Sequence, residues 1–525
     1  MSQRRILMIG LDGFDISLAD RFLEEGALPN IASLRARSAR FDLDHGVDKD
    51  SGLAWEHVST GQAPSDGARW SSVTFDPATY AIHQDPTSSP PFLADLSVRT
   101  VVFDVPYCDI TRSPNVRGLT AWGGHDPGVA MPGSRPKGLH AELWRKFGAY
   151  PAPEWIYGFC WPSAEKARQA GTALVRAVEV RNDAARWLLS ERLPDWDFAL
   201  VVVSEGHSAI EALWHGVDSS HPLHAIESGA PAGKALRDVY VAIDRLVGDM
   251  QAAFPDATVA LFAMHGMGSN DGDVPAMVLL PELLYRASFG KPYMEGIEYS
   301  GTTPDGVPLL AENDVWTDVM LRAVPEPQHS LTWSQRIRSW LSGTKPTSSN
   351  IAWMPAARYI EFWPRMAAFA MPAFYDGRIR INLHGREGCG MVPADKYHST
   401  CEEIIDLLRG CRNLLTGEDV VEEVRRPRKD PMAIGPSEAD LYVVWKSNPL
   451  GLSTPGLGNI GPIPYLRTGS HTGPRGFLYL AGEGIAPGAK NPVSSFDVVP
   501  TILDLLGQAR PTGVSGRSLA EQLSA

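Results

Sequence analysis

Three apolar runs of the chain each lead into a side chain that can bind a metal ion. RRILMIGLD ends in Asp12, FALVVVSEGH ends in His207, and TVALFAMHG carries His265 beside its end. Glu211 follows His207 by four residues, a spacing that places two side chains on one face of a helix. Imidazole and carboxylate groups are ligands of zinc and related metals. The same residues also fit a plain turn at Asp12 and an exposed helical ion pair.

These three runs must be positioned by a sheet. They are rich in β-branched residues and predict buried strands, while residues 164–192 and 233–254 show the three-and-four spacing of amphipathic helices. Strands alternating with helices predict an α/β fold whose central sheet is largely parallel and covered by helices on both faces. Ligands bind at the carboxyl ends of such strands, which is where the polar residues fall.

The domain organisation follows from where this periodicity weakens. Between residues 270 and 371 prolines and tryptophans accumulate, which predicts a cap or insertion, with the catalytic core formed by residues 1–269 and 372–525. Regular patterns return as strands at 378–385, 439–445 and 476–482 and as helices at 399–415 and 494–507. Residues 270–371 would shape the substrate pocket. They carry no motif that identifies the alcohol group of the substrate. The tryptophans Trp316, Trp333, Trp340, Trp353 and Trp363 fit either core packing or stacking on a substrate.

Composition narrows the classes of partner. The formal charge is −13 and no dense basic run occurs, which argues against binding of duplex nucleic acid. No apolar run reaches the roughly 18 residues of a membrane span, and the apolar start is too short for a signal peptide. We therefore expect a cytoplasmic protein that acts on a small molecule and binds no membrane.

Five motifs in order give the chain a recognisable resemblance. They are IGLDGFD with Asp12, DSGLAWEHVSTG with Ser51, the 101–127 segment, IRINLHGREGCGMV, and TGSHTGPRGFLYLAGEGI with His471. Together they resemble the alkaline phosphatase superfamily, in its branch of type I phosphodiesterase and nucleotide pyrophosphatase-like hydrolases. The resemblance implies a three-layer alkaline phosphatase-like sandwich with a cap insertion, and a nucleophile at Ser51.

The resemblance also implies a first metal site, with its ligand types exchanged. The usual pattern is Asp, three residues, His, then Trp, whereas this chain has His207, Glu211 and Trp214. With His471 these residues make a set of two imidazoles and one carboxylate. Such a set suits zinc first, with manganese or iron as alternatives.

The second implied metal site lacks a carboxylate. Its usual members are matched by Asp12, Ser51 and His265, but Met264 stands where the family has Asp. A thioether is a poor ligand for hard cations, so this site should bind metal weakly. Three outcomes stay open: one metal suffices, a nearby carboxylate substitutes, or hydrolysis has been lost. The candidate substitutes are Asp50, Asp271 and Asp273.

Other residues near the motifs have expected roles. Lys49, His125 and Asp126 are candidates for substrate binding. Glu205 is a candidate for a group that orients the metal ligands through hydrogen bonds, or for an additional ligand. Ser51 also fits a helix N-cap, and Arg386 fits a structural ion pair better than a phosphate clamp.

The sequence thus predicts a metal-dependent, phosphodiesterase-like hydrolase of phosphoric esters that forms a covalent phosphoserine at Ser51. Sulfate ester hydrolysis and phosphoryl or other group transfer are alternatives, although the Cys-x-Pro-x-Arg pattern of typical sulfatases is absent around Ser51. A non-catalytic binding protein with a degraded second metal site is the alternative from another class.

Overall fold

The computed structural model describes two compact units. It covers residues 5–85, 87, 89–124, 133–158, 162–326, 351–446 and 448–524. The first unit comprises Met1–Trp70, Pro86–Asn270 and Arg467–Ala525, and the second comprises Ser71–Asp85 and Asp271–Leu466.

The first unit is built on one large sheet. The three predicted strands are β1 (Ile6–Leu11), β8 (Phe198–Val203) and β9 (Thr258–Ala263), and β1 pairs in parallel with both of the others. The order across the sheet is β22 (Gly488–Ala489), β2 (Ala39–Asp44), β21 (Arg475–Ala481), β9, β1, β8, β5 (Thr100–Phe103), β6 (Val116–Leu119) and β7 (Ser134–Arg135). Strands β9, β1, β8, β5 and β6 run parallel, so the prediction of a largely parallel sheet is confirmed.

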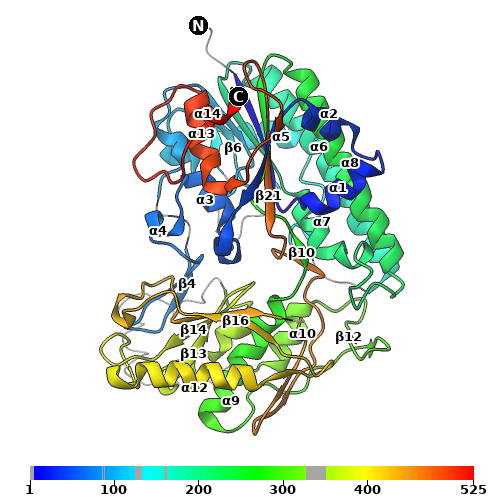
Figure 1. The fold of residues 1–525 in the computed structure, drawn as a ribbon. Coiled ribbons are helices and arrows are strands. Elements are labelled where there is room, and N and C mark those ends of the chain that lie inside the picture. The colour runs from blue at the N-terminus through cyan, green and yellow to red at the C-terminus, as the bar shows by residue number, and fades with distance from the viewer. Residues whose placement is uncertain are drawn as a thin grey trace. The chain divides into compact units, whose positions relative to one another are not determined.

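Helices cover both faces of this sheet (Figure 1). Leu7, Ile9 and Leu11 of β1 enter one apolar cluster, whereas Ile6 and Met8 enter the other, because side chains alternate along a strand. The first cluster lies under α1 (Ile16–Glu24), α2 (Pro29–Ala36), α5 (Leu139–Phe147), α6 (Ala164–Trp187), α7 (Glu205–Leu213) and α8 (Gly229–Ala253). The second lies under α3 (Ala54–Thr60), α13 (Val498–Leu505) and α14 (Ala520–Leu523). Burial on both faces explains why the strands read as continuous apolar runs.

The second unit has its own antiparallel sheet. Its order is β13 (Ala368–Met371), β14 (Gly377–Ile381), β17 (Leu441–Trp445) and β16 (Val421–Arg425). Its helices include α9 (Leu280–Phe289), α10 (Trp316–Ala323) and α12 (Tyr397–Gly410), and a hairpin of β3 (Val73–Phe75) and β4 (Ile82–Gln84) belongs to it.

The boundaries of this unit differ from the predicted insertion at 270–371. Strand β14 pairs with β13 on one side and with β17 on the other, so residues 372–466 share a sheet with the insertion. Sequence periodicity could not reveal this because pairing between distant strands leaves no local pattern. Helix α12 ends at Gly410, earlier than the predicted 399–415 helix, because the chain turns into β15 (Arg412–Asn413).

Two of the tryptophans of this region are core residues. Trp316 and Trp363 are each 1% exposed; Trp316 Nε1 donates to the Pro464 carbonyl at 2.8 Å, and Trp363 stacks on Phe369. Trp353 is 38% exposed, and Trp333 and Trp340 lie outside the described residues.

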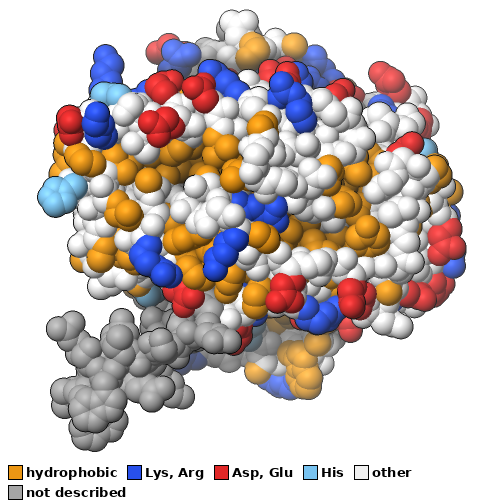
Figure 2. Space-filling view, turned by 90° about the horizontal axis from the view of Figure 1, so that it is seen from below, with side chains coloured by type: hydrophobic (Ala, Val, Ile, Leu, Met, Phe, Trp, Pro, Cys, Tyr) orange, Lys and Arg blue, Asp and Glu red, His pale blue; other side chains and the backbone are white. Residues whose placement is uncertain are grey.

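The described helices include none that is both long enough and apolar enough to cross a membrane. Figure 2 shows one face of the molecule, on which Lys and Arg side chains are interspersed with Asp and Glu rather than forming a continuous basic area.

Candidate active site

The predicted donor residues meet at the carboxyl ends of β1, β8 and β9. Asp12 follows β1, and His207 lies in α7, which begins two residues after β8 ends. His265 follows β9, and His471 follows β20 (Gly469–Ser470), which pairs with β10 (Gly268–Ser269). Parallel strands place their carboxyl ends at one edge, which is why residues so far apart in sequence converge.

The distances are those of a compact polar cluster. His207 Nδ1 lies 3.1 Å from Asp12 Oδ2, and His207 Nε2 lies 3.2 Å from both Glu211 Oε1 and His471 Nε2. The rings of His265 and His471 have centroids 4.6 Å apart. All five side chains are buried.

Glycines allow the backbone segments to come this close. Gly13, in GLDGFD, has φ +58°, and a Cβ there would lie 2.8 Å from His207 Cβ. A Cβ on Gly469 would lie 2.4 Å from the Ile210 carbonyl oxygen of α7. Both positions therefore exclude a side chain, so these glycines support the site sterically.

Glu211 contacts a cation that the sequence analysis missed. Its Oε1 pairs with Arg467 Nη1, and its Oε2 accepts from the Gly158 N–H at 2.8 Å. Arg467 is 7% exposed, and burial lowers the pKa of its guanidinium to about 9, which leaves it positive at neutral pH. The only sequence signal for a role of Arg467 in the site was its position four residues before His471. A single arginine in a loop forms no pattern that would predict such a role.

Glu205 is held by a different arginine. Arg181 of α6, fully buried, donates from Nε to both Glu205 carboxylate oxygens at 2.9 and 3.0 Å and from Nη1 to Asp104 Oδ2 at 2.8 Å. Burial raises the pKa of Glu205, and the positive charge of Arg181 opposes that rise. Glu205 thus fixes the start of the helix that carries His207, and of its two predicted roles the orienting one fits these contacts.

The second set of predicted donors contains Asp12 and His265. Asp12 Oδ2 is buried and accepts no hydrogen bond from a described residue. His265 Nδ1 lies 2.8 Å from the Gly266 carbonyl oxygen, so Nδ1 carries the proton and donates this hydrogen bond. Nε2 then carries the lone pair, which is the form of imidazole nitrogen that binds a metal ion. Met264 packs in the apolar cluster under α3 and supplies no oxygen.

The two donor sets differ in how well their chemistry suits a divalent ion. Within the described ranges, no three His, Cys, Asp or Glu side chains already form a ready-made metal-binding cluster. The chemistry of the first donor set nevertheless suits zinc, since His207 Nε2 contacts both the Glu211 carboxylate and the His471 imidazole, and His207 Nδ1 contacts the Asp12 carboxylate. The second set has a single carboxylate, Asp12, which already contacts His207.

Two further histidines lie beside the cluster. His45 Nε2 lies 3.0 Å from His57 Nδ1, and the His45 ring lies 5.9 Å from that of His265. Both are buried, and burial lowers the pKa of His57 to about 3. The sequence analysis missed them because a solitary histidine, six residues before or after Ser51, carries no spacing signal.

Ser51 ends a short 3-10 helix, Gly46–Ser51, and is 8% exposed. Its Oγ accepts from the Leu53 N–H at 3.1 Å, and α3 begins only at Ala54 with Leu53 as its N-cap, so Ser51 is not the cap residue. Lys49 Nζ donates to the His471 carbonyl at 3.4 Å, and a Cβ on Gly10 of β1 would lie 2.4 Å from Trp55. These contacts place the turn that carries Ser51 beside His471 and the end of β1.

Five other candidates lie outside the described residues or in the second unit. His125 and Asp126 lie outside the described residues, as does the side chain of Asp50. Asp271 and Asp273 belong to the second unit.

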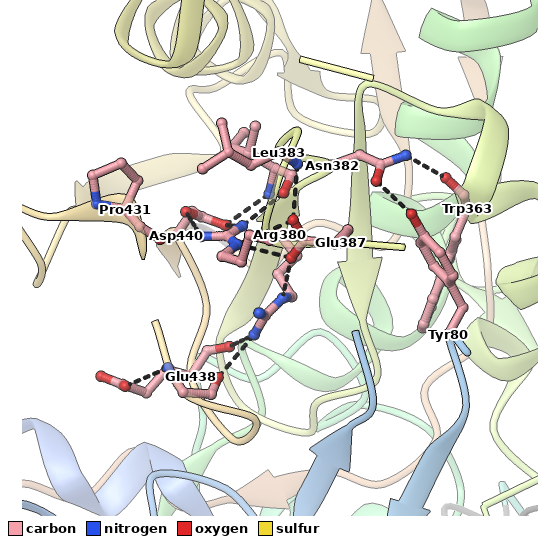
Figure 3. A network of polar contacts seen from close by, with 12 residues as sticks. Tyr80, Trp363, Arg380, Asn382, Leu383, Glu387, Pro431, Glu438 and Asp440 are labelled. Carbon is pink, nitrogen blue, oxygen red and sulfur yellow. Dashed lines mark hydrogen bonds and ion pairs between the residues drawn. The ribbon is translucent and has the colours of Figure 1, made fainter. Parts of the chain in front are cut away.

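Arg386, in the HGREG motif, lies in a saturated network of the second unit that includes Glu387 and Asp440, both of which Figure 3 labels. Its Nη1 and Nη2 donate to the two Asp440 oxygens at 2.9 and 2.7 Å, and its Nε donates to Glu387 Oε1 at 2.8 Å. The same two Nη groups also donate to the Pro431 and Ile381 carbonyls, both at 2.7 Å. Because all five N–H groups are used, the structural interpretation of Arg386 holds and a phosphate clamp does not.

Comparisons with known proteins agree with this geometry. The family model for type I phosphodiesterase/nucleotide pyrophosphatase matches residues 6–295, more than half of the chain. The structure is similar to phosphonoacetate hydrolase from Sinorhizobium meliloti 1021 in complex with phosphonoformate, at 14% identity and TM-score 0.50 over 96% of each chain. It is also similar to a mutant of alkaline phosphatase PafA, at 12% identity and TM-score 0.51 over 99% of each chain. These similarities show an alkaline phosphatase-like fold. A comparison with curated protein sequences gave no match.

Proposed function

The chain belongs to the type I phosphodiesterase/nucleotide pyrophosphatase family of phosphoester hydrolases, and from that premise we propose that it cleaves phosphodiesters in a metal-dependent reaction through a covalent phosphoserine at Ser51. The observation that carries the proposal is the convergence of His207, Glu211 and His471 within contact distance at the carboxyl edge of the sheet.

These three residues, with Asp12, would hold one divalent ion, and zinc suits their donor types, with manganese or iron as alternatives. When bound, the ion supplies Lewis acidity that polarises a phosphoryl oxygen. Members of the superfamily generally use divalent metals, which agrees with this donor set.

Ser51 supplies the nucleophilic oxygen in this proposal. Its Oγ accepts the Leu53 N–H, a hydrogen bond that favours negative charge on that oxygen. Oγ would form a bond to phosphorus while the alcohol leaves with a proton, and water would then cleave the phosphoserine. The balance is one diester and one water giving one monoester and one alcohol.

Phosphodiesters fit the described charges better than monoesters do. A monoester dianion calls for clustered arginine or lysine donors. Near the site the structure describes Lys49, which donates to the His471 backbone, and Arg467, which pairs with Glu211. A singly charged diester needs fewer cationic partners.

The test is hydrolysis of bis-p-nitrophenyl phosphate by the full chain loaded with zinc or manganese. Ser51→Ala should lower kcat by about a thousandfold or more, because it removes the oxygen that the proposed covalent intermediate requires. Ser59→Ala is the matched control: Ser59 is also buried, at 1% exposed against 8% for Ser51, and its hydroxyl donates to the Tyr107 carbonyl at 3.1 Å.

Wild type but not Ser51→Ala should yield phosphoserine at residue 51 when quenched during turnover and analysed by mass spectrometry. Equal rates for wild type and Ser51→Ala would remove Ser51 from the mechanism. A protein that binds metal but cleaves no phosphate or sulfate ester would be a binding protein instead.

A further inference from the structure

The contact between Arg467 and Glu211 introduces a fixed positive charge into the donor cluster. Glu211 is the one carboxylate of the first donor set, and its Oε1 contacts both His207 Nε2 and Arg467 Nη1. Glu211 is 0% exposed and Arg467 is 7% exposed, so solvent screens this charge weakly.

The backbone holds Arg467 in place. Asn270 Nδ2 donates to the Arg467 carbonyl at 3.0 Å, and the Asn270 N–H donates to the Thr468 carbonyl at 3.0 Å. The Thr468 N–H in turn donates to the Glu211 carbonyl at 2.7 Å. The segment that carries Arg467 is therefore tied to the end of α7 and to the chain after β9, and the guanidinium is a built part of the site.

The charge balance of the cluster follows from these contacts. Among four described side chains, Asp12 and Glu211 contribute two negative charges and Arg467 and Lys49 contribute two positive charges, so the sum over these four is zero. One divalent ion raises the sum to +2 and two raise it to +4. Because like charges repel strongly where solvent is excluded, the second ion is strongly disfavoured.

Met264, the residue after β9, also disfavours a second ion. Met264 supplies no charge where a carboxylate would offset a second ion, and it packs in the apolar cluster under α3. Loss of one anion and presence of one buried arginine both reduce the capacity of the cluster for divalent ions.

We propose that the Arg467 guanidinium replaces one of two divalent ions, so that this centre holds a single divalent ion beside a permanent organic cation. The stoichiometry of one ion is argued from the donor cluster alone. A second role, in which the guanidinium donates its N–H groups to a phosphoryl oxygen, rests on the proposed function.

The test is titration of the full chain, freed of metal by chelator, with Mn²⁺ or Zn²⁺, followed by calorimetry and by elemental analysis of the dialysed protein. Wild type should bind one equivalent. Arg467→Met removes the repelling charge and releases Glu211, so the Kd of the bound ion should fall about tenfold or more. Arg467→Lys keeps the charge and should bind metal as wild type does. A purely structural role for Arg467 would weaken metal binding in Arg467→Met instead.

Arg475→Met is the control, because the Arg475 side chain is 46% exposed and pairs with Asp20 at 3.5 Å. Two equivalents in wild type, no binding at all, or unchanged or weaker binding by Arg467→Met would each overturn the proposal. If circular dichroism shows that Arg467→Met does not fold, the wild-type stoichiometry and Arg467→Lys decide. Tighter metal binding by Arg467→Met in a protein that cleaves no ester would keep this inference and reject the proposed function.

Discussion

The donor cluster of the first unit and the Arg386 network of the second unit are both buried and polar, but they differ in how completely their atoms are paired. Arg386 uses all five N–H groups, and Asp440 accepts from Arg386, from the Tyr397 hydroxyl at 2.8 Å and from the Ile381 N–H at 2.7 Å. In the donor cluster and its surroundings, Asp12 Oδ2 and His57 Nε2 are buried and accept or donate no hydrogen bond among the described residues.

The difference separates a polar group kept for stability from one kept for a ligand. An unsatisfied buried polar atom costs about 1–3 kcal/mol, so a protein retains it where something else uses the atom. The saturated network has nothing left to offer a substrate, although its HGREG motif is as conspicuous in sequence as the residues of the donor cluster.

The largest expected effect on folding comes from breaking the saturated network. Asp440→Ala leaves the buried Arg386 guanidinium without its bidentate partner and should lower the free energy of unfolding by about 3–5 kcal/mol, measured by equilibrium urea unfolding. Asp12→Ala, the matched change in the donor cluster, should lower it by less, about 1 kcal/mol, because Asp12 Oδ2 accepts no hydrogen bond from a described residue. Equal losses for the two variants would erase the distinction between the regions.

Binding of a metal ion at the donor cluster should stabilise the protein, whereas the Arg386 network should not respond to metal. At a free Mn²⁺ or Zn²⁺ concentration a hundredfold above Kd, the free energy of unfolding should rise by about 3 kcal/mol, seen as a higher Tm by scanning calorimetry. His207→Ala should abolish this increase, since it removes the imidazole that contacts Glu211 and His471. The exposed His398, in the second unit, offers the control, and His398→Ala should keep the full increase.

A smaller effect should appear on acidification. Burial lowers the pKa of His57 from 6.5 to about 3, so between these values the unfolded chain binds a proton that the folded chain does not. Stability is therefore present above about pH 6.5 and is lost as the pH falls, by about 2 kcal/mol at pH 5 for this one residue. His57→Gln should reduce the loss between pH 8 and pH 5, measured by urea unfolding; an unchanged pH profile would show that His57 is not buried as a neutral ring.

Much of the fold could be predicted from local sequence patterns. The runs that became β1, β8 and β9 and the patterns that became α6 and α8 were readable because a strand buried on both faces and an amphipathic helix impose their periods on neighbouring residues. The extent of the second unit was not readable, because the pairing of β14 with β17 joins residues about sixty positions apart.

The candidate site likewise has features that could be predicted from the sequence and features that could not. By itself the sequence determined the donor types, through Asp12, His207, Glu211, His265 and His471, and the loss of a carboxylate at Met264, since the order of motifs marks them. Only the tertiary structure decided that Arg467 contacts Glu211 and that His45 and His57 lie beside His265. The physical reason is that electrostatic balance depends on distance and burial in space, and neither quantity is encoded by the spacing of residues along the chain.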